Sequence, residues 1–351
     1  MPADEVGFVD LDAYDYALPP GCIAQEPPAE RDAGRLMVLE RRDAAVVHAL
    51  LRDLPRWLEP GDLLVVNTTR VLPARLRGRK ASGGAAEALL LGSLAGETPR
   101  YRALVRASGR LRPGQKYRFE GAGRALDAEL LEVDAEGVAV LGFAADAQPY
   151  EIGEAPLPPY IRRDAPRSED LERYQTLFAR EPGSVAAPTA GLHLSERVLA
   201  ALAERGVERA EVTLHVGPGT FRPVRARDIA ARRLHAERFA LSEATAEQIT
   251  RTRARGGRVV AVGTTTARVL ESCAGAAGGV LPRRGDTELF LLPGMPFRVV
   301  DALLTNFHLP RSSLLLLVAA FAGREAVLDA YAEAVRAGYR FYSYGDAMLI
   351  R

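Results

Sequence analysis

Cysteines and long apolar runs are scarce in this 351-residue sequence. Cys22 and Cys273 are its two cysteines, and neither lies in a C-x-x-C pattern, so a disulfide framework is not expected. The five histidines include no H-x-x-x-H pair, which leaves no pattern for a metal site. The most apolar run, Ser313–Phe321, is far shorter than the ~20 residues that span a bilayer. The acidic N-terminus lacks the features of a secretory signal, and we therefore expect a cytoplasmic protein without membrane segment or metal.

Charge is unevenly distributed along the chain. The net charge is +1 and the composition is that of a globular protein, with 48% apolar and 26% charged residues. Residues 70–124 carry 13 Lys or Arg against three Asp or Glu, whereas residues 1–60 carry six against 12. Such a split indicates a basic face for a polyanion. An arginine-rich codon bias is the alternative explanation, although such a bias does not separate the two signs along the chain.

The middle of the chain reads as a series of short strands. Partial alternation of apolar and polar residues recurs between turn signals such as Pro113-Gly114, which predicts a small antiparallel barrel or sandwich. The expected strands are Ala88–Leu91, Tyr101–Val105, Lys116–Phe119, Leu126–Val133 and Val138–Phe143.

Strands and helices alternate in the C-terminal half, which is typical of an α/β layer. The expected strands are Leu63–Val66, Ala210–Val216, Arg258–Val262, Ala302–Thr305 and a terminal Tyr339–Ser343, and the expected helices include Glu243–Arg253, Ala267–Ser272, Ser313–Phe321 and Glu325–Arg336. The Gly/Ala-rich segment Gly275–Gly285 is expected to be a surface loop. We predict a two-domain α+β or α/β protein: residues 1–72 and 152–351 form the α/β catalytic domain, and residues 73–151 form an inserted small antiparallel β-barrel.

Two glycine-containing loops follow expected strands, where ligands of such sheets usually bind. Gly263–Arg268 opens a helix, so its free N–H groups and threonine hydroxyls suit an anion; alternatively, Thr266 simply caps the helix. His215–Thr220 resembles the first motif of class I methyltransferases, but Pro223 follows where a helix should begin. A tight turn is the other interpretation of this loop.

Several histidines lie beside other polar residues. His193 lies in a loop of small residues, and His235 and Glu237 alternate so that they share one face of a strand. The pair could orient the imidazole for proton transfer, although a surface ion pair is the commoner meaning. Asn306–Ser313 combines an amide, an aromatic ring, an imidazole and an arginine, which is typical of a binding loop.

Taken together, these segments resemble the S-adenosylmethionine:tRNA ribosyltransferase-isomerase family over nearly the whole chain. The matching segments are Asp15–Pro19, Ile23–Pro27, Arg31–Leu36, Gly61-Asp62, Pro73–Leu76, Leu157–Arg162, Tyr174–Thr176, Gly183–His193, Val212–Phe221, Val262–Thr265, Thr305–Pro310 and Ser343–Met348. Two positions depart from the family pattern: Thr68 replaces an aspartate and Leu234 replaces a methionine.

The resemblance implies transfer of the ribosyl part of S-adenosylmethionine onto 7-aminomethyl-7-deazaguanine at the wobble position of tRNA. Epoxyqueuosine-tRNA, adenine and methionine would be the products. S-adenosylmethionine is then a co-substrate, and the partner is the anticodon stem-loop that carries the modified base. A monomer is expected. An S-adenosylmethionine-dependent tRNA methyltransferase and a non-catalytic tRNA-binding protein are the alternatives.

Three groups of site residues follow from the resemblance and from the residue chemistry. For proton transfer we expect His215, His193, His235 and His308, with Glu237 and Asp346 as partners. For the cofactor we expect Thr189, Ala190, Gly191, Gly217, Gly219, Gly263, Thr264, Thr265, Arg268 and Asn306. For the RNA substrate we expect Arg31, Asp32, Asn67, Arg70, Arg75, Tyr160, Arg162, Phe307 and Tyr344.

Overall fold

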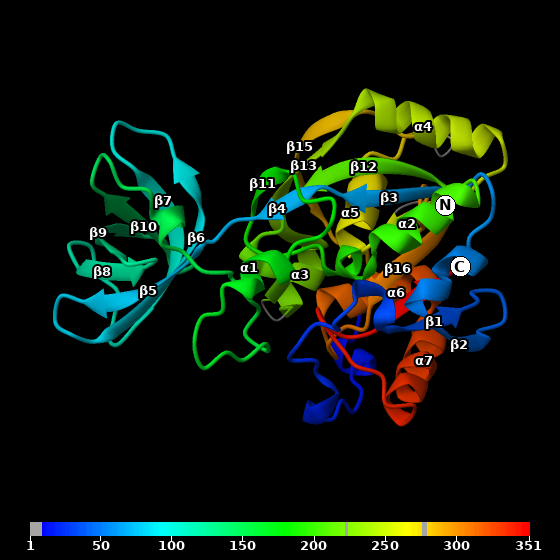
Figure 1. Ribbon diagram of the computed structural model, residues 1–351, viewed down its shortest axis with the longest axis horizontal. Helices are drawn as coiled ribbons and strands as arrows, with labels where there is room; N and C mark the ends of the chain where they lie inside the picture. The colour runs from blue at the N-terminus through cyan, green and yellow to red at the C-terminus, as the bar shows by residue number, and fades with distance from the viewer. Residues whose placement is uncertain (1–8, 222–223, 276–278) are drawn as a thin grey trace.

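A computed structural model describes residues 9–221, 224–275 and 279–351, and it contains a large mixed sheet and a closed barrel lying side by side (Figure 1). The nine-stranded sheet has the order β15-β13-β12-β3-β14-β16-β17-β1-β2. Its strands are β1 (Arg35–Leu39), β2 (Val46–Leu50), β3 (Leu63–Asn67), β12 (Glu208–Leu214), β13 (Arg233–Leu241), β14 (Val259–Val262), β15 (Arg283–Leu289), β16 (Ala302–Asn306) and β17 (Ala347–Ile350).

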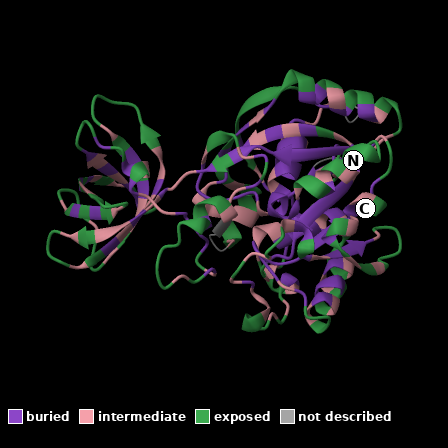
Figure 2. Cartoon of the chain, viewed as in Figure 1, coloured by how far each residue is buried: buried purple, intermediate pink, exposed green. Residues whose placement is uncertain are grey.

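The centre of the sheet is parallel and covered on both faces. β3 pairs in parallel with β12 and β14, and β14 with β16. Figure 2 shows the buried residues concentrated in this region. Because neither face meets water, these strands are apolar throughout and do not alternate.

Two hydrophobic cores lie on opposite faces of the sheet. Leu63 and Val65 face the core that α4, α5, α6 and α7 complete, whereas Leu64 and Val66 face the core formed with α2 and the 3-10 helix Leu51–Trp57. The α-helices are α1 (Glu169–Arg173), α2 (Glu196–Glu204), α3 (Ala226–Ala231), α4 (Glu243–Ala254), α5 (Thr264–Ser272), α6 (Ser313–Ala322) and α7 (Arg324–Arg336). No described helix is long and apolar enough to cross a membrane.

The barrel has six antiparallel strands in the closed order β10-β7-β6-β5-β8-β9 and a core of its own. Its strands are β5 (Arg75–Lys80), β6 (Ala85–Leu94), β7 (Arg100–Ala107), β8 (Lys116–Gly121), β9 (Arg124–Val133) and β10 (Val138–Phe143). Between the barrel and the sheet, β4 (Thr69–Val71) pairs in parallel with β11 (Glu181–Ser184) (Figure 1).

The predicted fold class, an α/β layer with a small antiparallel barrel, is confirmed. Two local expectations are corrected. Tyr339–Ser343 is irregular, and the terminal strand is β17, which begins at Ala347. The expected loop Gly275–Gly285 includes residues 276–278, which lie outside the described residues, and from Arg283 onward the chain forms β15.

The topology brings the ends of six strands to one edge of the sheet. The carboxyl ends of β3, β12, β14 and β16 lie there, and so do the amino ends of β17 and β1, because β17 is antiparallel to β16 and β1 is parallel to β17. This edge therefore carries Asn67, His215, Gly263, Asn306 and Asp346. Ligands of open α/β sheets bind at such an edge.

Candidate functional site

A cavity of about 480 Å³ lies beyond the end of β16. Its size is within the range of small-molecule sites. Most of its wall is apolar, and its polar groups come from loops that are far apart in the sequence. They include Tyr160, Thr189, Asn306, His308, Tyr342 and Ser343.

The Asn306 amide holds three walls of this cavity together. Its Nδ2 donates to the Tyr342 carbonyl at 3.0 Å and to His193 Nε2 at 2.8 Å, while its Oδ1 accepts the Thr189 hydroxyl at 3.0 Å. A carbonyl can only accept, so the atom facing Tyr342 is the amide nitrogen. His193 Nε2 is therefore an acceptor, and the proton of this neutral imidazole is on Nδ1.

Tyr342 occupies the cavity wall in a strained conformation. Its φ of 71° is in the left-handed region, which costs energy for a residue with a Cβ. Its hydroxyl is buried with no hydrogen-bond partner among the described residues, although burying such a group unpaired is unfavourable. Its ring lies 4.2 Å from that of Tyr160, whose hydroxyl contacts Ser343 Oγ at 2.6 Å. Tyr342 lines the cavity, but its hydroxyl is enclosed by protein atoms and does not face the cavity.

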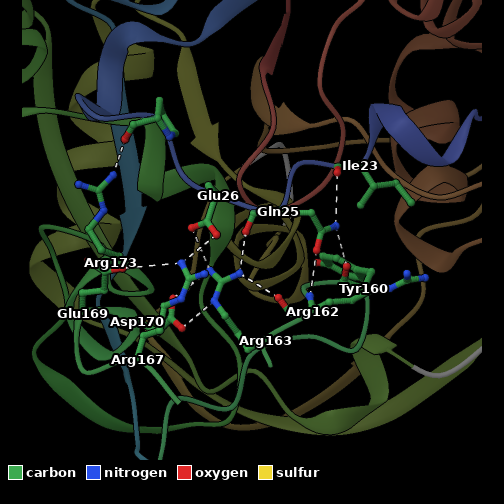
Figure 3. Close-up of polar contacts among 11 residues, drawn as sticks. Ile23, Gln25, Glu26, Tyr160, Arg162, Arg163, Arg167, Glu169, Asp170 and Arg173 are labelled. Carbon is green, nitrogen blue, oxygen red and sulfur yellow. Dashed lines mark hydrogen bonds and ion pairs between the residues drawn. The ribbon is translucent and has the colours of Figure 1, made fainter. Parts of the chain in front are cut away.

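Tyr160 is held in place by a polar network that joins its loop to the N-terminal segment (Figure 3). Gln25 Nε2 donates to the Tyr160 carbonyl at 2.9 Å, and Gln25 Oε1 accepts the backbone N–H of Arg162 at 2.9 Å. Arg163, whose side chain is 4% exposed, pairs through two nitrogens with Asp170 at 2.9 and 3.0 Å. This network fixes the loop from which Tyr160 reaches the cavity.

A larger cleft of about 860 Å³ separates the barrel from the β12–β13 end of the sheet. Arg102 and Tyr150 line its barrel side, and the sheet side includes His215, Gly217, Gly219, His235, Glu237 and Arg238. The segment Gly183–Thr189 runs between the two hollows: Gly183 and Val185 line the cleft, whereas Ala186, Ala187 and Thr189 line the cavity. The structure thus provides two adjacent hollows of different size and character.

His215 is half-buried at the wall of this cleft. Its Nδ1 contacts Thr69 Oγ1 at 2.9 Å. Burial lowers the pKa of His215, and the nearby Arg238 cation lowers it further. The imidazole is therefore neutral near physiological pH.

Glu237 and Arg268 form a buried ion pair, with 6% and 5% of each residue exposed. Glu237 Oε1 also accepts the backbone N–H of Gly217 at 2.8 Å, and Arg268 Nε donates to the Leu289 carbonyl at 2.9 Å. The pair joins α5 to β13 and to the glycine loop after β12. Glu237 was expected as a proton-transfer partner and Arg268 as a cofactor ligand. In the structure the two side chains pair with each other.

The start of α5 has the geometry expected for an anion site. The helix begins at Thr264, two residues before Thr266, and its N-cap Gly263 has a φ of 90°, which favours glycine. Among the described residues no side chain caps this end, whereas the Thr266 hydroxyl donates back to the Val262 carbonyl at 2.8 Å. The interpretation of Thr266 as the cap is therefore wrong, and a role for this helix start in anion binding stays a prediction.

Asn67 and Thr68 stabilise the ends of β3 and β12. Asn67 Nδ2 donates to the Leu214 carbonyl at 3.0 Å and its Oδ1 accepts the Leu214 N–H at 3.1 Å. The hydroxyl of Thr68, the residue that departs from the family pattern, contacts Thr213 Oγ1 at 2.9 Å. Both side chains are buried and satisfied, so Asn67 has a structural explanation beside its predicted role in substrate binding.

Four residues expected to contact ligands or to assist proton transfer have structural partners in the fold, and their predicted roles stay predictions. Phe307 is fully buried against aromatic rings that include Tyr331 and Phe341, so it has no free face on which a base can stack. Asp346 accepts the backbone N–H groups of Arg35 and Arg340 at 2.8 Å. Asp32, 1% exposed, pairs with Arg197, and Arg75 pairs with Glu87. Residue type alone does not distinguish such fold-stabilising groups from ligand contacts.

Arg31, His193 and Tyr344 line a separate small hollow on the other side of Ser343. Arg70 and Arg162 are exposed, and Ala190 and Gly191 are buried in the 3-10 helix Thr189–His193. Thr69, Ser184 and Tyr342 were not predicted as site residues. Thr69 and Ser184 are buried hydroxyl residues at the ends of short strands, and nothing in the sequence marks the left-handed backbone of Tyr342.

We expect the stability of the protein to fall as the pH drops below about 6.5. Burial lowers the pKa of His193 to about 4 and that of His308 to about 3. Histidines of the unfolded chain take up protons near pH 6.5, so between that pH and about 4 the unfolded state binds more protons than the folded state. The free energy of unfolding then falls by up to about 1.4 kcal/mol per pH unit for each histidine.

Urea unfolding between about pH 7 and pH 5 measures this slope. His308→Asn should reduce this slope relative to the wild-type protein. An unchanged slope in the variant would contradict the assignment of His308 as a buried neutral group.

Comparison with known proteins identifies the family. The model of the family described as queuosine biosynthesis protein matches residues 11–350. The S-adenosylmethionine:tRNA ribosyltransferase-isomerase of Anaeromyxobacter dehalogenans strain 2CP-C is 55% identical, covering 97% of this chain and 99% of its own, and that of Gloeobacter violaceus is 54% identical over 99% and 97%. The crystal structure of S-adenosylmethionine tRNA ribosyltransferase from Thermotoga maritima is 38% identical, covering 97% of this chain and all of its own, with a TM-score of 0.54. The chain belongs to the queuosine biosynthesis protein family.

Proposed function

We propose that the protein transfers and isomerises the ribosyl moiety of S-adenosylmethionine onto 7-aminomethyl-7-deazaguanine at the wobble position of tRNA, with release of adenine and methionine. The near end-to-end match to ribosyltransferase-isomerases carries this proposal. The reaction needs a site for a small cofactor beside a site for RNA, and the two adjacent hollows suit that need. The cytoplasm, where tRNA is available, is the proposed location.

We assign S-adenosylmethionine to the cavity and the anticodon loop to the cleft. The cavity is smaller and mainly apolar, with Tyr160 and the Asn306–Thr189 pair in its wall. Such a site suits an adenosine-sized ligand held by a few oriented polar groups. The cleft is larger and carries Arg102 and Arg238, and cations in an open groove suit an RNA backbone.

The chemistry requires a base for the protons beside the sulfonium and a neutral attacking amine. A general base works best when its pKa lies near the operating pH. His193 and His308, with pKa values of about 4 and 3, are too weakly basic and are better suited to hydrogen bonding. His235 is exposed in the cleft, on the strand that carries Glu237. We assign to His235 the removal of a proton from the attacking amine, which belongs to the RNA in the cleft.

The direct test incubates the purified protein with S-adenosylmethionine and tRNA that carries the aminomethyl-deazaguanine. Adenine and methionine in equal amounts, appearing only with the modified tRNA, are the expected products, and mass spectrometry of the small molecules measures them. Release of S-adenosylhomocysteine would favour a methyltransferase. Tight tRNA binding without turnover would favour a non-catalytic binding protein.

We propose that residues 73–151 fold as an inserted domain that contacts the anticodon stem. Arg100, Arg102 and Arg106 project from alternate positions of β7, are exposed, and form no ion pair with the described residues. By contrast, Arg118 on β8 contacts Asp127 at 3.2 Å. Unpaired cations in a row are available to successive phosphates.

Replacing the three β7 arginines with glutamine should weaken tRNA binding and flatten its salt dependence. Each phosphate contact that is lost reduces the magnitude of the slope of log K against log salt by about 0.7–0.9, so the slope of the triple variant should be smaller by about two to three. Binding titrations at several salt concentrations measure the slope. Arg118→Gln is the matched control, because β8 lies across the barrel from β7; equal losses in both would argue against a β7 contact surface.

A further inference from the structure

Three side chains from separate segments form a chain of hydrogen bonds beside the cleft. Ser184 ends β11, Thr69 begins β4, and His215 follows β12. Ser184 Oγ and Thr69 Oγ1 are 2.7 Å apart, and Thr69 Oγ1 and His215 Nδ1 are 2.9 Å apart. The backbone N–H of Val216 donates to Ser184 Oγ at 2.7 Å. Both hydroxyl residues are fully buried, so water does not complete their hydrogen bonds.

The positions of the hydrogens in this chain follow from counting donors and acceptors. Ser184 Oγ accepts a hydrogen bond from the Val216 N–H. Among the described residues, the acceptor within reach of the Ser184 hydroxyl hydrogen is Thr69 Oγ1. The Thr69 hydrogen is then directed at His215 Nδ1, which must carry a lone pair. If Nδ1 carried the proton instead, either the Ser184 or the Thr69 hydrogen would be buried without an acceptor, which is unfavourable.

We propose that Thr69 and Ser184 are positioning residues that hold His215 as the neutral tautomer with its proton on Nε2, so that His215 presents a hydrogen-bond donor to a ligand in the cleft. The ligand atom must be an acceptor, such as a base carbonyl, a ring nitrogen or a ribose oxygen of RNA. The identity of this ligand rests on the proposed function, whereas the tautomer does not. His215 in this state is not a general base at Nε2.

Two further observations agree with a fixed neutral ring. A Cβ at Gly183 would lie 2.6 Å from His215 Nδ1, so any side chain there would displace the imidazole. Burial and the Arg238 cation both lower the pKa of His215. Protonation would also place a hydrogen on Nδ1 against the Thr69 hydroxyl hydrogen, which disfavours the imidazolium further.

NMR of the full-length protein with ¹⁵N-labelled histidine tests the tautomer directly, because protonated and unprotonated ring nitrogens have distinct ¹⁵N shifts. Spectra at about pH 8, above the ordinary histidine pKa of about 6.5, should show His215 Nδ1 unprotonated and Nε2 protonated; His215→Asn assigns the signals. Thr69→Val should produce a mixture of tautomers, and Thr69→Ser should restore the single form. A protonated Nδ1 in the wild type, or no change in Thr69→Val, would overturn the proposal.

Thr68→Val is the matched control, because Thr68 is an adjacent buried threonine whose hydroxyl contacts Thr213 and not His215. It should leave the His215 signals unchanged, and the same loss of tautomer in both variants would overturn a specific role for Thr69. In the tRNA assay, Thr69→Val should lower kcat about tenfold, as expected for one oriented hydrogen bond. If the protein lacks the proposed activity, the NMR result still stands, so the two failures are distinguishable.

Discussion

Replacing Arg268 with methionine should destabilise the protein by about 3–5 kcal/mol, because it leaves the Glu237 carboxylate buried without a counter-charge. Both residues are about 95% buried, and Arg268 also donates to the Leu289 carbonyl. Glu237→Gln should also destabilise the protein: a glutamine oxygen can still accept the Gly217 N–H that Glu237 accepts at 2.8 Å, but the buried Arg268 cation loses its counter-charge. Urea unfolding of the variants measures these differences.

The double variant Glu237→Gln/Arg268→Met should be more stable than Arg268→Met alone. It removes both charges together, and replacing a buried pair as a unit is often close to neutral, while the acceptor for Gly217 is kept. A loss below about 1 kcal/mol in Arg268→Met would contradict the structural role of the pair. If the double variant regains stability but remains inactive, a role in the reaction is favoured for one of the two side chains.

The parts of the fold that sequence patterns predict are those with strong periodicity or clear turns. The barrel strands alternate between core and solvent, so five of the six were expected, and the long helices were placed within about a turn. The terminal strand was misplaced. Ala347–Ile350 is buried on both faces and therefore shows no alternation, whereas Tyr339–Ser343 is rich in aromatic residues but has Tyr342 at a φ of 71°, which no propensity reveals.

The sequence predicts which loops form the candidate site, but it does not predict which side chains of those loops line the cavity or the cleft. Residues of one motif separate in space: Asn306 and His308 reach the cavity, while Phe307 between them packs in the core. The histidines also divide, since His308 lines the cavity whereas His215 and His235 line the cleft. Alternation and spacing indicate where a loop starts, but the side on which each side chain emerges depends on tertiary packing.

Asn306→Asp should lower kcat/KM by at least about 100-fold, chiefly by disordering the cavity. The amide nitrogen donates to the Tyr342 carbonyl and to His193 Nε2, and a carboxylate offers no hydrogen to either. The Tyr342 contact would become a repulsion between two acceptors, at a cost of about 1–3 kcal/mol for a buried group left unpaired. His193 could keep its contact only by moving its proton from Nδ1 to Nε2. Tyr342 would lose the contact that holds its strained backbone, and the binding of S-adenosylmethionine should weaken with it.

The pH dependence of this variant separates a lost hydrogen bond from general damage. A hydrogen-bond donor to the Tyr342 carbonyl returns only when the introduced carboxyl group is protonated, so the activity of Asn306→Asp relative to the wild type should rise as the pH falls. Calorimetric binding of S-adenosylmethionine and kcat/KM between about pH 8 and pH 6 measure the effect. Gln115→Glu, an amide-to-acid change at the Arg110 carbonyl in the barrel, is the control and should leave both quantities unchanged. Wild-type cofactor affinity in Asn306→Asp would place S-adenosylmethionine outside this cavity.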